Sequence, residues 1–256
     1  MVRLFEGKNI LVARASDQAG ELSMLIKDYG GNPIEIPVIK ISPVTNFDEL
    51  DNGIKSLRSY DWIIFSSVNG VNRVFERIFD LGLDYKIFQG SKIGAIGPAT
   101  SKALIDYGVN IDLKPQEYVS ESMLTEFTKI GINGKLILLF SAVRTSNILH
   151  DGLIEAGALI KRISVYSTAT RRESGPILND VMSKNQIDIV TFTSSSTVKG
   201  FLDLLNGRDE LINVIIACIG PVTANTARDN GLDVHIVAKV STISSLVSGM
   251  IDYFRE

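Results

Sequence analysis

Short runs of consecutive apolar residues alternate along the chain with segments whose apolar residues recur every three or four positions. Consecutive apolar positions are typical of strands that are covered on both faces. The expected strands are Asn9–Ala13, Pro33–Ile41, Trp62–Ser66, Lys92–Gly97, Asn110–Leu113, Lys135–Phe140, Leu159–Tyr166, Ile187–Thr193, Val214–Ile219 and Val234–Val237. Strands that alternate with helices predict an α/β fold with parallel sheets and crossover helices.

The expected helices each carry one apolar stripe. In the last of them the stripe contains Ile243, Leu246, Val247 and Met250, at the spacing of one helix face. Gly108 follows one short helical segment, and we expect it to end that helix. Gly231 follows a second segment of similar sequence and is expected to do the same.

The chain contains an internal duplication. Three pairs of segments share a pattern: GKNILVA (7–13) with GKLILLF (134–140), DWIIFSSVNGVNRVF (61–75) with DIVTFTSSSTVKGFL (188–202), and IGPATSKAL (96–104) with IGPVTANTA (219–227). The members of the first two pairs are 127 residues apart and those of the third pair 123, so one copy has a four-residue insertion. We therefore expect two similar modules, with the binding site between their loops.

Composition narrows the class of protein. A chain of 256 residues is long enough for two small domains, and its 45% hydrophobic and 21% charged residues are ordinary for a globular protein. The net charge of −3 gives no general case for binding nucleic acid or an anionic membrane. No apolar stretch approaches the length of a membrane span, and we expect no signal peptide. The single cysteine, Cys218, favours a reducing, cytoplasmic setting.

Several loops that lead from an expected strand to an expected helix are rich in small hydroxyl residues. They are FSSVNG (65–70), FTSSST (192–197), GPAT (97–100) and GPVT (220–223). At the carboxyl ends of parallel strands, helix N-termini present unpaired N–H groups that favour anions. The alternative interpretation is that these residues only cap their helices.

The inventory of reactive side chains is sparse. The chain has no phosphate-binding loop motif and no cluster at metal-ligand spacing. His150 and His235 are consistent with structural or surface roles, and a lone cysteine cannot supply a two-thiol acid–base pair. Asp61 and Asp188 precede strands at the end opposite the proposed site, so we expect them to be structural. The pattern indicates a binding cleft rather than covalent catalysis.

Over essentially its whole length the chain resembles the uroporphyrinogen-III synthases. The resemblance depends on an ordered set of segments: ARAS (13–16), FSSVNG, IGPAT, VYST (165–168), FTSSST and IGPVT. It implies two similar α/β domains, with parallel sheets covered by helices on both faces, joined by a two-stranded β-ladder. The implied domains are 1–38 plus 172–256 and 49–164, with 39–48 and 165–171 as the ladder.

The resemblance also implies a reaction. Hydroxymethylbilane, a linear tetrapyrrole, would lose water and cyclise to uroporphyrinogen III with inversion of its last pyrrole ring, in haem, sirohaem or corrinoid biosynthesis. The pyrrole nitrogen drives departure of the hydroxyl, so no cofactor or metal is implied. The protein has to fold the chain, stabilise charge and prevent the uninverted closure.

Site residues follow from the same resemblance. Tyr166 corresponds to a family tyrosine that assists departure of the hydroxyl, because a phenol stays protonated at neutral pH and can donate a hydrogen bond. The expected substrate-binding residues are Arg14, Ser66, Ser67, Thr100, Arg144, Ser194, Ser195, Val222 and Thr223. The alternatives are a tyrosine packed at a domain edge and arginines that are ordinary surface charges.

Two other classes of protein stay open on the residues alone. One is a non-catalytic two-domain protein that binds small anions, and the other is a receiver-type signalling module, although the acidic pocket of that module is missing. The resemblance favours a monomer that contacts hydroxymethylbilane synthase transiently, with no nucleic-acid or membrane partner. Two modules on a narrow connection are also expected to close on the substrate.

Overall fold

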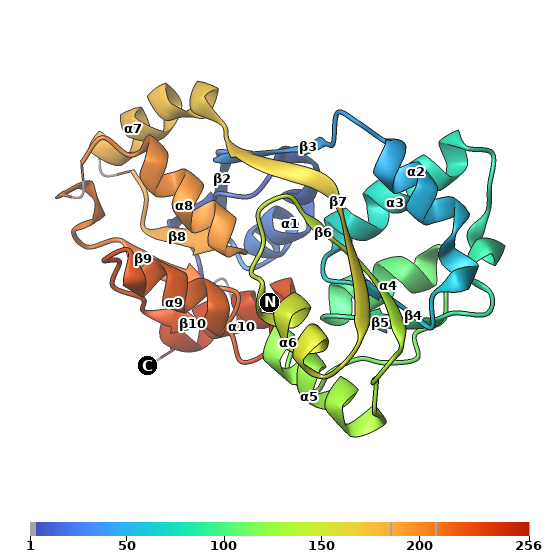
Figure 1. The fold of residues 1–256 in the computed structure, drawn as a ribbon. Helices are drawn as coiled ribbons and strands as arrows, with labels where there is room; N and C mark the ends of the chain where they lie inside the picture. The colour runs from blue at the N-terminus through green and yellow to red at the C-terminus, as the bar shows by residue number, and fades with distance from the viewer. Residues whose placement is uncertain (1–3, 185, 208, 256) are drawn as a thin grey trace. The chain divides into compact units, whose positions relative to one another are not determined.

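Figure 1 shows the computed structural model of the chain, which describes residues 4–184, 186–207 and 209–255. Contacts divide the chain into two compact units, a terminal unit (Met1–Ile41 and Ala169–Glu256) and a central unit (Ser42–Thr168). The chain therefore passes from one unit to the other twice, after Ile41 and after Thr168. Both passages fall within the stretches that the sequence assigns to a ladder.

The terminal unit is built on a parallel sheet whose strands lie in the order β10-β9-β8-β1-β2 in the described part of the chain. These strands are β1 (Asn9–Val12), β2 (Asn32–Glu35), β8 (Ile189–Phe192), β9 (Ile215–Cys218) and β10 (Ile236–Val237). Most residues of the three middle strands, β9, β8 and β1, are buried, because helices cover both faces.

Alternate residues of β1 face the two helical layers of the terminal unit. Ile10 and Val12 share a core with α1 (Gly20–Asp28) and α10 (Ile243–Tyr253). Leu11 and the following Ala13 share the other core with three helices. These helices are α7 (Gly175–Ser183), α8 (Ser195–Leu204) and α9 (Pro221–Asp229). The short 3-10 helices of the unit are η1 (Ser16–Gln18), η4 (Arg172–Ser174) and η5 (Asp209–Leu211).

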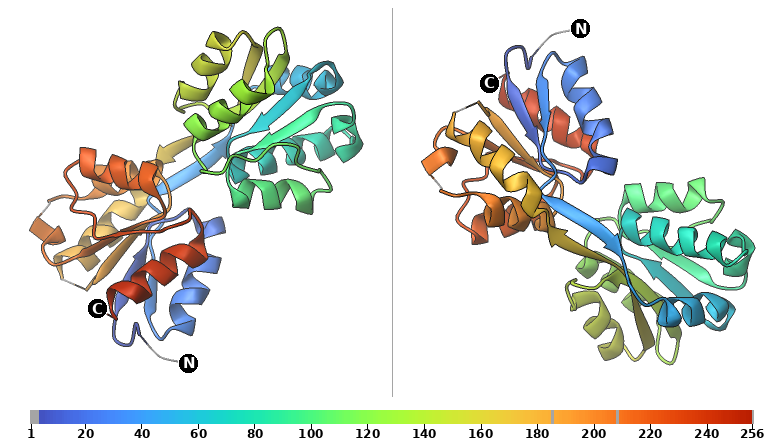
Figure 2. Two further views of the ribbon diagram at one scale, coloured as in Figure 1. Left: turned by 90° about the horizontal axis from the view of Figure 1, so that it is seen from below. Right: turned by 90° about the horizontal axis from the view of Figure 1, so that it is seen from above.

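The central sheet has the strand order β3-β7-β6-β4-β5 among the described residues. Its strands are β3 (Ile39–Pro43), β4 (Trp62–Phe65), β5 (Lys92–Ala95), β6 (Leu136–Ala142) and β7 (Leu159–Thr170). Strands β7, β6, β4 and β5 run parallel. Figure 2 shows β3 in blue beside β7 in yellow, and these two strands are the segments in which the chain passes between the units.

Helices also cover both faces of the central sheet. On one face Ile64 and Leu139 pack with α5 (Ser120–Ile130) and α6 (Ile148–Glu155). On the other, Phe65 and Phe140 lie with their ring centroids 5.1 Å apart, beneath α3. The remaining helices of the unit are α2 (Asp48–Lys55), α3 (Val68–Asp80), α4 (Pro98–Asp106), η2 (Leu57–Ser59) and η3 (Tyr85–Phe88).

The duplication appears in the structure with its halves exchanged. Helices α4 and α5 recur as α9 and α10 at an offset of 123 residues (221 − 98 and 243 − 120). Strands β1 and β4 recur as β6 and β8 at an offset of 127 (136 − 9 and 189 − 62). The terminal unit thus combines the first half of one copy with the second half of the other. The two sheets match strand for strand, β2-β1-β8-β9 to β7-β6-β4-β5.

Three local predictions need correction. The expected strand Pro33–Ile41 is two strands, because the chain leaves the terminal sheet at Pro37, which has no N–H to donate to a strand neighbour. The expected strand Asn110–Leu113 is only a single bridge from Leu113 to Gly94, the position that β10 occupies in the other unit. The first ladder stretch ends early, since α2 begins at Asp48.

Equivalent carboxylates hold the amino ends of the two sheets. Asp61 accepts a hydrogen bond from the N–H of Leu136 at 2.8 Å and from Lys135 Nζ at 3.0 Å. Asp188 accepts from the N–H of Asn9 at 2.7 Å and from Lys8 Nζ at 3.2 Å. Each carboxylate therefore ties the start of one strand to its neighbour, and this supports the structural role that the sequence indicates.

The predicted fold class is confirmed: two similar α/β modules have parallel sheets covered by helices on both faces. Gly108 and Gly231, with φ of 86° and 78°, follow the ends of α4 and α9 as predicted. In the described ranges no helix is both long and apolar enough to cross a bilayer.

Candidate active site

The predicted site residues of the central unit lie at the carboxyl ends of its strands. Ser66 and Ser67 follow β4, and Thr100 lies in the first turn of α4, which follows the neighbouring strand β5. Arg144 follows β6, and Tyr166 lies on β7 opposite Ala142, the last residue of β6. These five residues are called the central rim below.

Tyr166 is a largely enclosed member of the central rim, with 8% of its surface exposed. Its hydroxyl oxygen lies 3.1 Å from Ser67 Oγ, at the start of α3. The β6–β7 register shifts between Ser141 and Ala142, directly beside Tyr166. Such irregularities redirect a side chain at the end of a sheet. The phenol is therefore brought to the same end of the sheet as the serine-rich loop.

Five predicted residues form an equivalent group in the terminal unit, called the terminal rim. Arg14 follows β1, Ser194 and Ser195 follow β8, and Val222 and Thr223 lie in the first turn of α9 after β9. Because β1, β8 and β9 are neighbours in a parallel sheet, these residues lie along one edge. Each rim thus carries half of the predicted set.

The serine hydroxyls at the starts of α3 and α8 are helix caps. Ser67 Oγ accepts from the N–H of Gly70 at 3.1 Å, and Ser194 Oγ accepts from the N–H of Thr197 at 3.3 Å. Both side chains therefore cap their helices. Ser66 Oγ donates to the carbonyl of Phe140 at 3.4 Å, and Ser195 Oγ pairs with Thr226 Oγ1 at 2.6 Å.

The starts of α4 and α9 have a different construction. Neither helix has a side-chain cap, and each begins with a proline after a glycine. The N–H groups of Val222 and Thr223 precede the first intrahelical donor of α9, the N–H of Ala224, which bonds Gly220 at 3.0 Å. The hydroxyls of Thr100 and Thr223 make no hydrogen bond to any other residue that the structure describes. These two helix ends are the parts of the rims best suited to accept an anion.

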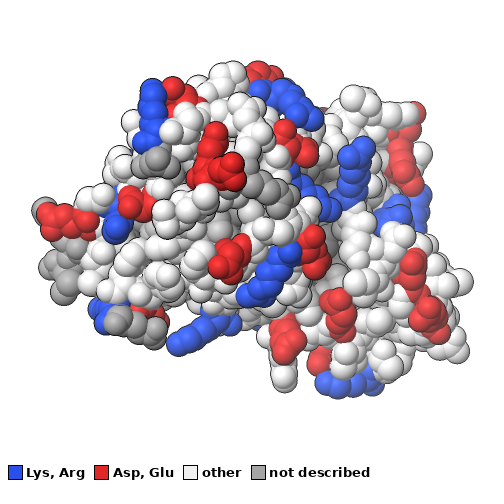
Figure 3. All heavy atoms as spheres, turned by 90° about the vertical axis from the view of Figure 1, so that its left-hand side faces the viewer, with Lys and Arg blue, Asp and Glu red and all other residues white. Residues whose placement is uncertain are grey.

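The two arginines differ in environment. Arg14 is half-buried, and its Nε donates to Gln18 Oε1 at 3.3 Å. Arg144 is exposed and has no ion pair within the described part of the chain. On the face drawn in Figure 3, lysine and arginine side chains are interspersed with aspartate and glutamate. That face therefore carries no large patch of a single charge sign.

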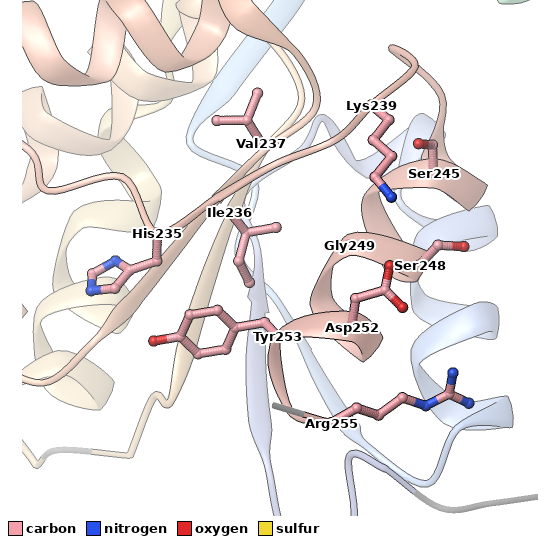
Figure 4. A pocket seen from close by; sticks show the side chains of 10 residues that line it. All are labelled: His235, Ile236, Val237, Lys239, Ser245, Ser248, Gly249, Asp252, Tyr253 and Arg255. Carbon is pink, nitrogen blue, oxygen red and sulfur yellow. The ribbon is translucent and has the colours of Figure 1, made fainter.

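A separate cleft of about 570 Å³ lies between β10 and α10. Figure 4 shows His235 and Tyr253 at one side of it and Lys239, Ser245 and Asp252 at the other. No predicted site residue lines this cleft. The rims differ from this cleft because they carry helix N-termini and, in the central unit, a buried phenol. Within the described ranges no group of three His, Cys, Asp or Glu residues could hold a metal ion.

Comparison with known proteins identifies the family. The family model of uroporphyrinogen-III synthase HemD matches residues 20–248 of the chain. The chain belongs to the uroporphyrinogen-III synthase family. Members of this family are cyclising lyases that convert hydroxymethylbilane to uroporphyrinogen III in tetrapyrrole biosynthesis. The predicted family, enzyme class and reaction are thereby confirmed.

Individual relatives align with almost the full length of this chain. A uroporphyrinogen-III synthase of Synechococcus elongatus is 26% identical over 98% of this chain and 97% of its own length. A putative uroporphyrinogen-III synthase of Methanocaldococcus jannaschii is 31% identical, with 96% and 97% covered. The porphyrin biosynthesis protein HemD of Ruminiclostridium josui is 28% identical over 96% of this chain, which spans only 48% of that relative.

Solved structures of two uroporphyrinogen-III synthases share the fold. The one from Thermus thermophilus, a triple mutant, has a TM-score of 0.71 at 19% identity, with 97% of this chain and 99% of that chain covered. The one from Helicobacter pylori has a TM-score of 0.63 at 19% identity, with 96% and 98% covered. At this identity the similarity extends to the fold and not to individual side chains.

Sequence reasoning missed several residues that shape the synthase rims. Gly70 and Val165 lie against the Ser67–Tyr166 pair, and Thr226 holds the Ser195 hydroxyl. Alignment of the two copies could have indicated Gly70, because it stands where the other copy has Thr197, at the offset of 127. Val165 and Thr226 are ordinary core and helix residues in the sequence, and only the structure reveals their contacts.

Proposed function

We propose that Tyr166 donates a hydrogen bond, and then its proton, to the departing hydroxyl of hydroxymethylbilane. The observation that carries the proposal is the phenol of Tyr166, buried at the carboxyl end of the central sheet beside the N-terminus of α3. A buried donor near a positive helix end is well placed to stabilise an oxygen that gains negative charge.

The chemistry follows from the substrate. As the C–O bond breaks, its electron pair leaves with the oxygen, which takes a proton and departs as water, while the pyrrole nitrogen supplies electrons to form an azafulvene. The substituted carbon of the last ring attacks this electrophile, and the spirocyclic product fragments and recloses with that ring reversed. Because the substrate supplies the electronic push, the protein needs only to assist the leaving group and control geometry.

The two rims provide donors for the acetate and propionate arms. We assign this role to the N–H groups at the starts of α4 and α9 and to the hydroxyls of Thr100 and Thr223. The proposed set is completed by Arg14, Arg144, Ser66, Ser194 and the backbone N–H groups of Ser67, Ser195 and Val222. Support comes from the uncapped helix starts and from threonine hydroxyls that have no partner among the described residues. A carboxylate at such a position gains from hydrogen bonds and from the helix macrodipole.

The activity is tested by incubating the protein with freshly prepared hydroxymethylbilane and separating the type III and type I isomers. We expect mainly type III product. Tyr166→Phe should lower kcat toward the lower end of the roughly 10²- to 10⁴-fold range of acid catalysis, and raise the share of type I. Tyr60→Phe, just before β4 at the opposite end of the sheet, is the matched control and should behave as the parent protein. Wild-type product no richer in type III than an enzyme-free sample would refute the function.

Carboxylate binding is tested at the threonines. Thr100→Val and Thr223→Val remove a hydroxyl at nearly constant volume, so each should raise KM more than it lowers kcat. Loss of one hydrogen bond to a charged group predicts an increase of about tenfold or more. An unchanged KM in both variants would remove these threonines from the binding set.

We also propose a monomeric enzyme in a reducing, cytoplasmic compartment that contacts hydroxymethylbilane synthase transiently. The single cysteine, Cys218, is free and buried, which is consistent with such a setting. Light scattering during gel filtration would reveal a dimer. Coupled assays with the upstream enzyme, with and without a trap for free hydroxymethylbilane, would reveal direct transfer of the unstable substrate.

A further inference from the structure

Ser67 makes two hydrogen bonds through one hydroxyl. Its Oγ accepts from the N–H of Gly70 at 3.1 Å and lies 3.1 Å from the hydroxyl oxygen of Tyr166. A serine hydroxyl has one hydrogen to donate and two lone pairs. With one lone pair used by Gly70, the hydrogen is available to Tyr166. If Ser67 donates to the phenol oxygen, the Tyr166 hydrogen has to point elsewhere.

The duplicated copy shows that this contact is not a general feature of the fold. Ser194 is the equivalent of Ser67 at the offset of 127 and caps α8 in the same way. There Thr197 completes a capping box with the N–H of Ser194, and Ser194 Oγ pairs with Ser196 Oγ at 2.9 Å. The residue equivalent to Tyr166 is Ile39, which has no hydroxyl.

Gly70 makes room for the contact in the central unit. It occupies the helix position that Thr197 occupies in the other copy. A Cβ atom added to Gly70 would lie 3.3 Å from Ser67 Oγ and 3.9 Å from Val165 Cγ2. The added atom would therefore lie tightly against the serine hydroxyl and in ordinary van der Waals contact with β7. The differences between the copies, in the first turn of α3 and on β7, all favour contact between serine and tyrosine.

We propose that Ser67 is a positioning residue for Tyr166: it donates its hydrogen to the phenol oxygen and directs the Tyr166 hydrogen toward the substrate. This inference rests on the proposed role of Tyr166. When the Tyr166 proton passes to the leaving hydroxyl, the C–O bond breaks and water departs. The phenolate that remains keeps the Ser67 hydrogen bond at the N-terminus of α3. It recovers a proton when the closing macrocycle loses one to restore its last pyrrole.

Substitutions at Ser67 separate the donor from the helix cap. Ser67→Thr keeps both functions and should retain most of kcat. Ser67→Asp keeps a good cap but has no hydrogen to donate, and Ser67→Ala loses both. We expect the Ser67→Asp and Ser67→Ala variants to have about a 10- to 100-fold lower kcat, because each loses one hydrogen bond to a developing charge. KM should change far less. A Ser67→Asp variant with a kcat near that of the parent protein would overturn the role of Ser67 as a hydrogen-bond donor.

A double-mutant cycle with Tyr166→Phe tests whether Ser67 acts through the tyrosine. Ser67→Ala should cost nothing further once the phenol is gone. Independent, multiplicative losses in the double variant would overturn the proposal. Thr242→Ala is the control for cap loss, because Thr242 Oγ1 accepts from the N–H of Ser245 at 3.2 Å at the start of α10 in the other unit. It should lower stability without lowering kcat.

These outcomes distinguish the proposal from the function on which it rests. Failure of the wild-type protein to form type III product refutes the function itself. An active wild type with unimpaired Tyr166→Phe refutes the role of the tyrosine and, with it, this inference. A strong effect of Tyr166→Phe together with an active Ser67→Asp variant refutes only the positioning by Ser67.

Discussion

Replacement of Gly200 by alanine should destabilise the terminal unit, although alanine is the better helix former. Gly200 lies inside α8, where the helix packs on the segment that leads out of the terminal unit. A Cβ atom there would lie 2.8 Å from the carbonyl oxygen of Val38 and 2.8 Å from Ile39 Cγ2. The Val38 carbonyl already accepts the N–H of Arg171 at 2.9 Å. The backbone therefore cannot move away without weakening that bond.

The change in the free energy of unfolding on Gly200→Ala combines three contributions. Alanine gains about 1 kcal/mol over glycine in a helix interior. Overpacking of a close contact typically costs about 1–3 kcal/mol. Weakening the hydrogen bond between Arg171 and Val38 costs up to about 1 kcal/mol more. Together they predict a loss of between about 0 and 3 kcal/mol in the free energy of unfolding, centred on about 1.5 kcal/mol.

Urea denaturation of Gly200→Ala measures this loss as a lower midpoint at an unchanged slope. Amide hydrogen exchange of α8 is measured as well. This second measurement reports on the terminal unit itself, because the two units need not unfold in one step. Gly20→Ala is the control, since Gly20 begins α1 and a Cβ atom there meets nothing within 4 Å. Gly200→Ala protein as stable as the parent, with unchanged exchange in α8, would show that the close approach of Val38 is not rigid and would refute the reasoning.

Three further predictions concern ionisable groups. The hydrogen bond from Arg77 holds the pKa of Asp51 below its usual range. The stabilisation that the ionised Asp51 gives the folded protein is therefore present above the unfolded pKa of about 4, and it is lost as the pH falls through the lower folded value. Urea midpoints of Asp51→Asn should therefore depend less on pH below about 4 than those of the parent, and equal dependence would contradict this. Burial raises the pKa of the Cys218 thiol to about 12, so iodoacetamide at neutral pH should modify it far more slowly in folded than in urea-unfolded protein, as followed by mass spectrometry. Asp61→Ala and Asp188→Ala should each lower the urea midpoint but leave KM unchanged, because these carboxylates lie at the amino ends of the sheets; a raised KM would argue against their structural role.

Much of the fold could be predicted from the sequence because the signals were local and repeated. Consecutive apolar residues such as those of β4 and β8 indicate buried parallel strands, and the two copies support each other at constant offsets. The strand break at Pro37 was missed because the apolar pattern continues through it. The missing hydrogen-bond donor, rather than hydrophobicity, decides where the chain leaves the sheet.

The candidate site was predictable by position but not by contact. Strand ends followed by Ser and Thr place the rim residues at the carboxyl edge of each sheet, as the structure has them. The pairing of Ser67 with Tyr166 joins residues 99 positions apart, and it depends on a register shift in the β6–β7 pair. Polar and apolar residues are mixed along β7 on both sides of the shift, so no regular periodicity in the sequence reports it.

The position of one glycine on equivalent helices contributes to the difference in chemistry between the two copies. In α3 the glycine is Gly70, in the first turn, so β7 approaches the helix cap and Tyr166 reaches Ser67. In α8 the glycine is Gly200, one turn later, and the Val38 segment approaches the middle of the helix instead. Ser194 is then left to complete its hydrogen bonds within its own helix turn. A shift of one helical turn in the closest approach, together with Ile39 in place of Tyr166 and Thr197 in place of Gly70, thus gives one unit a tyrosine–serine pair and the other a capping box.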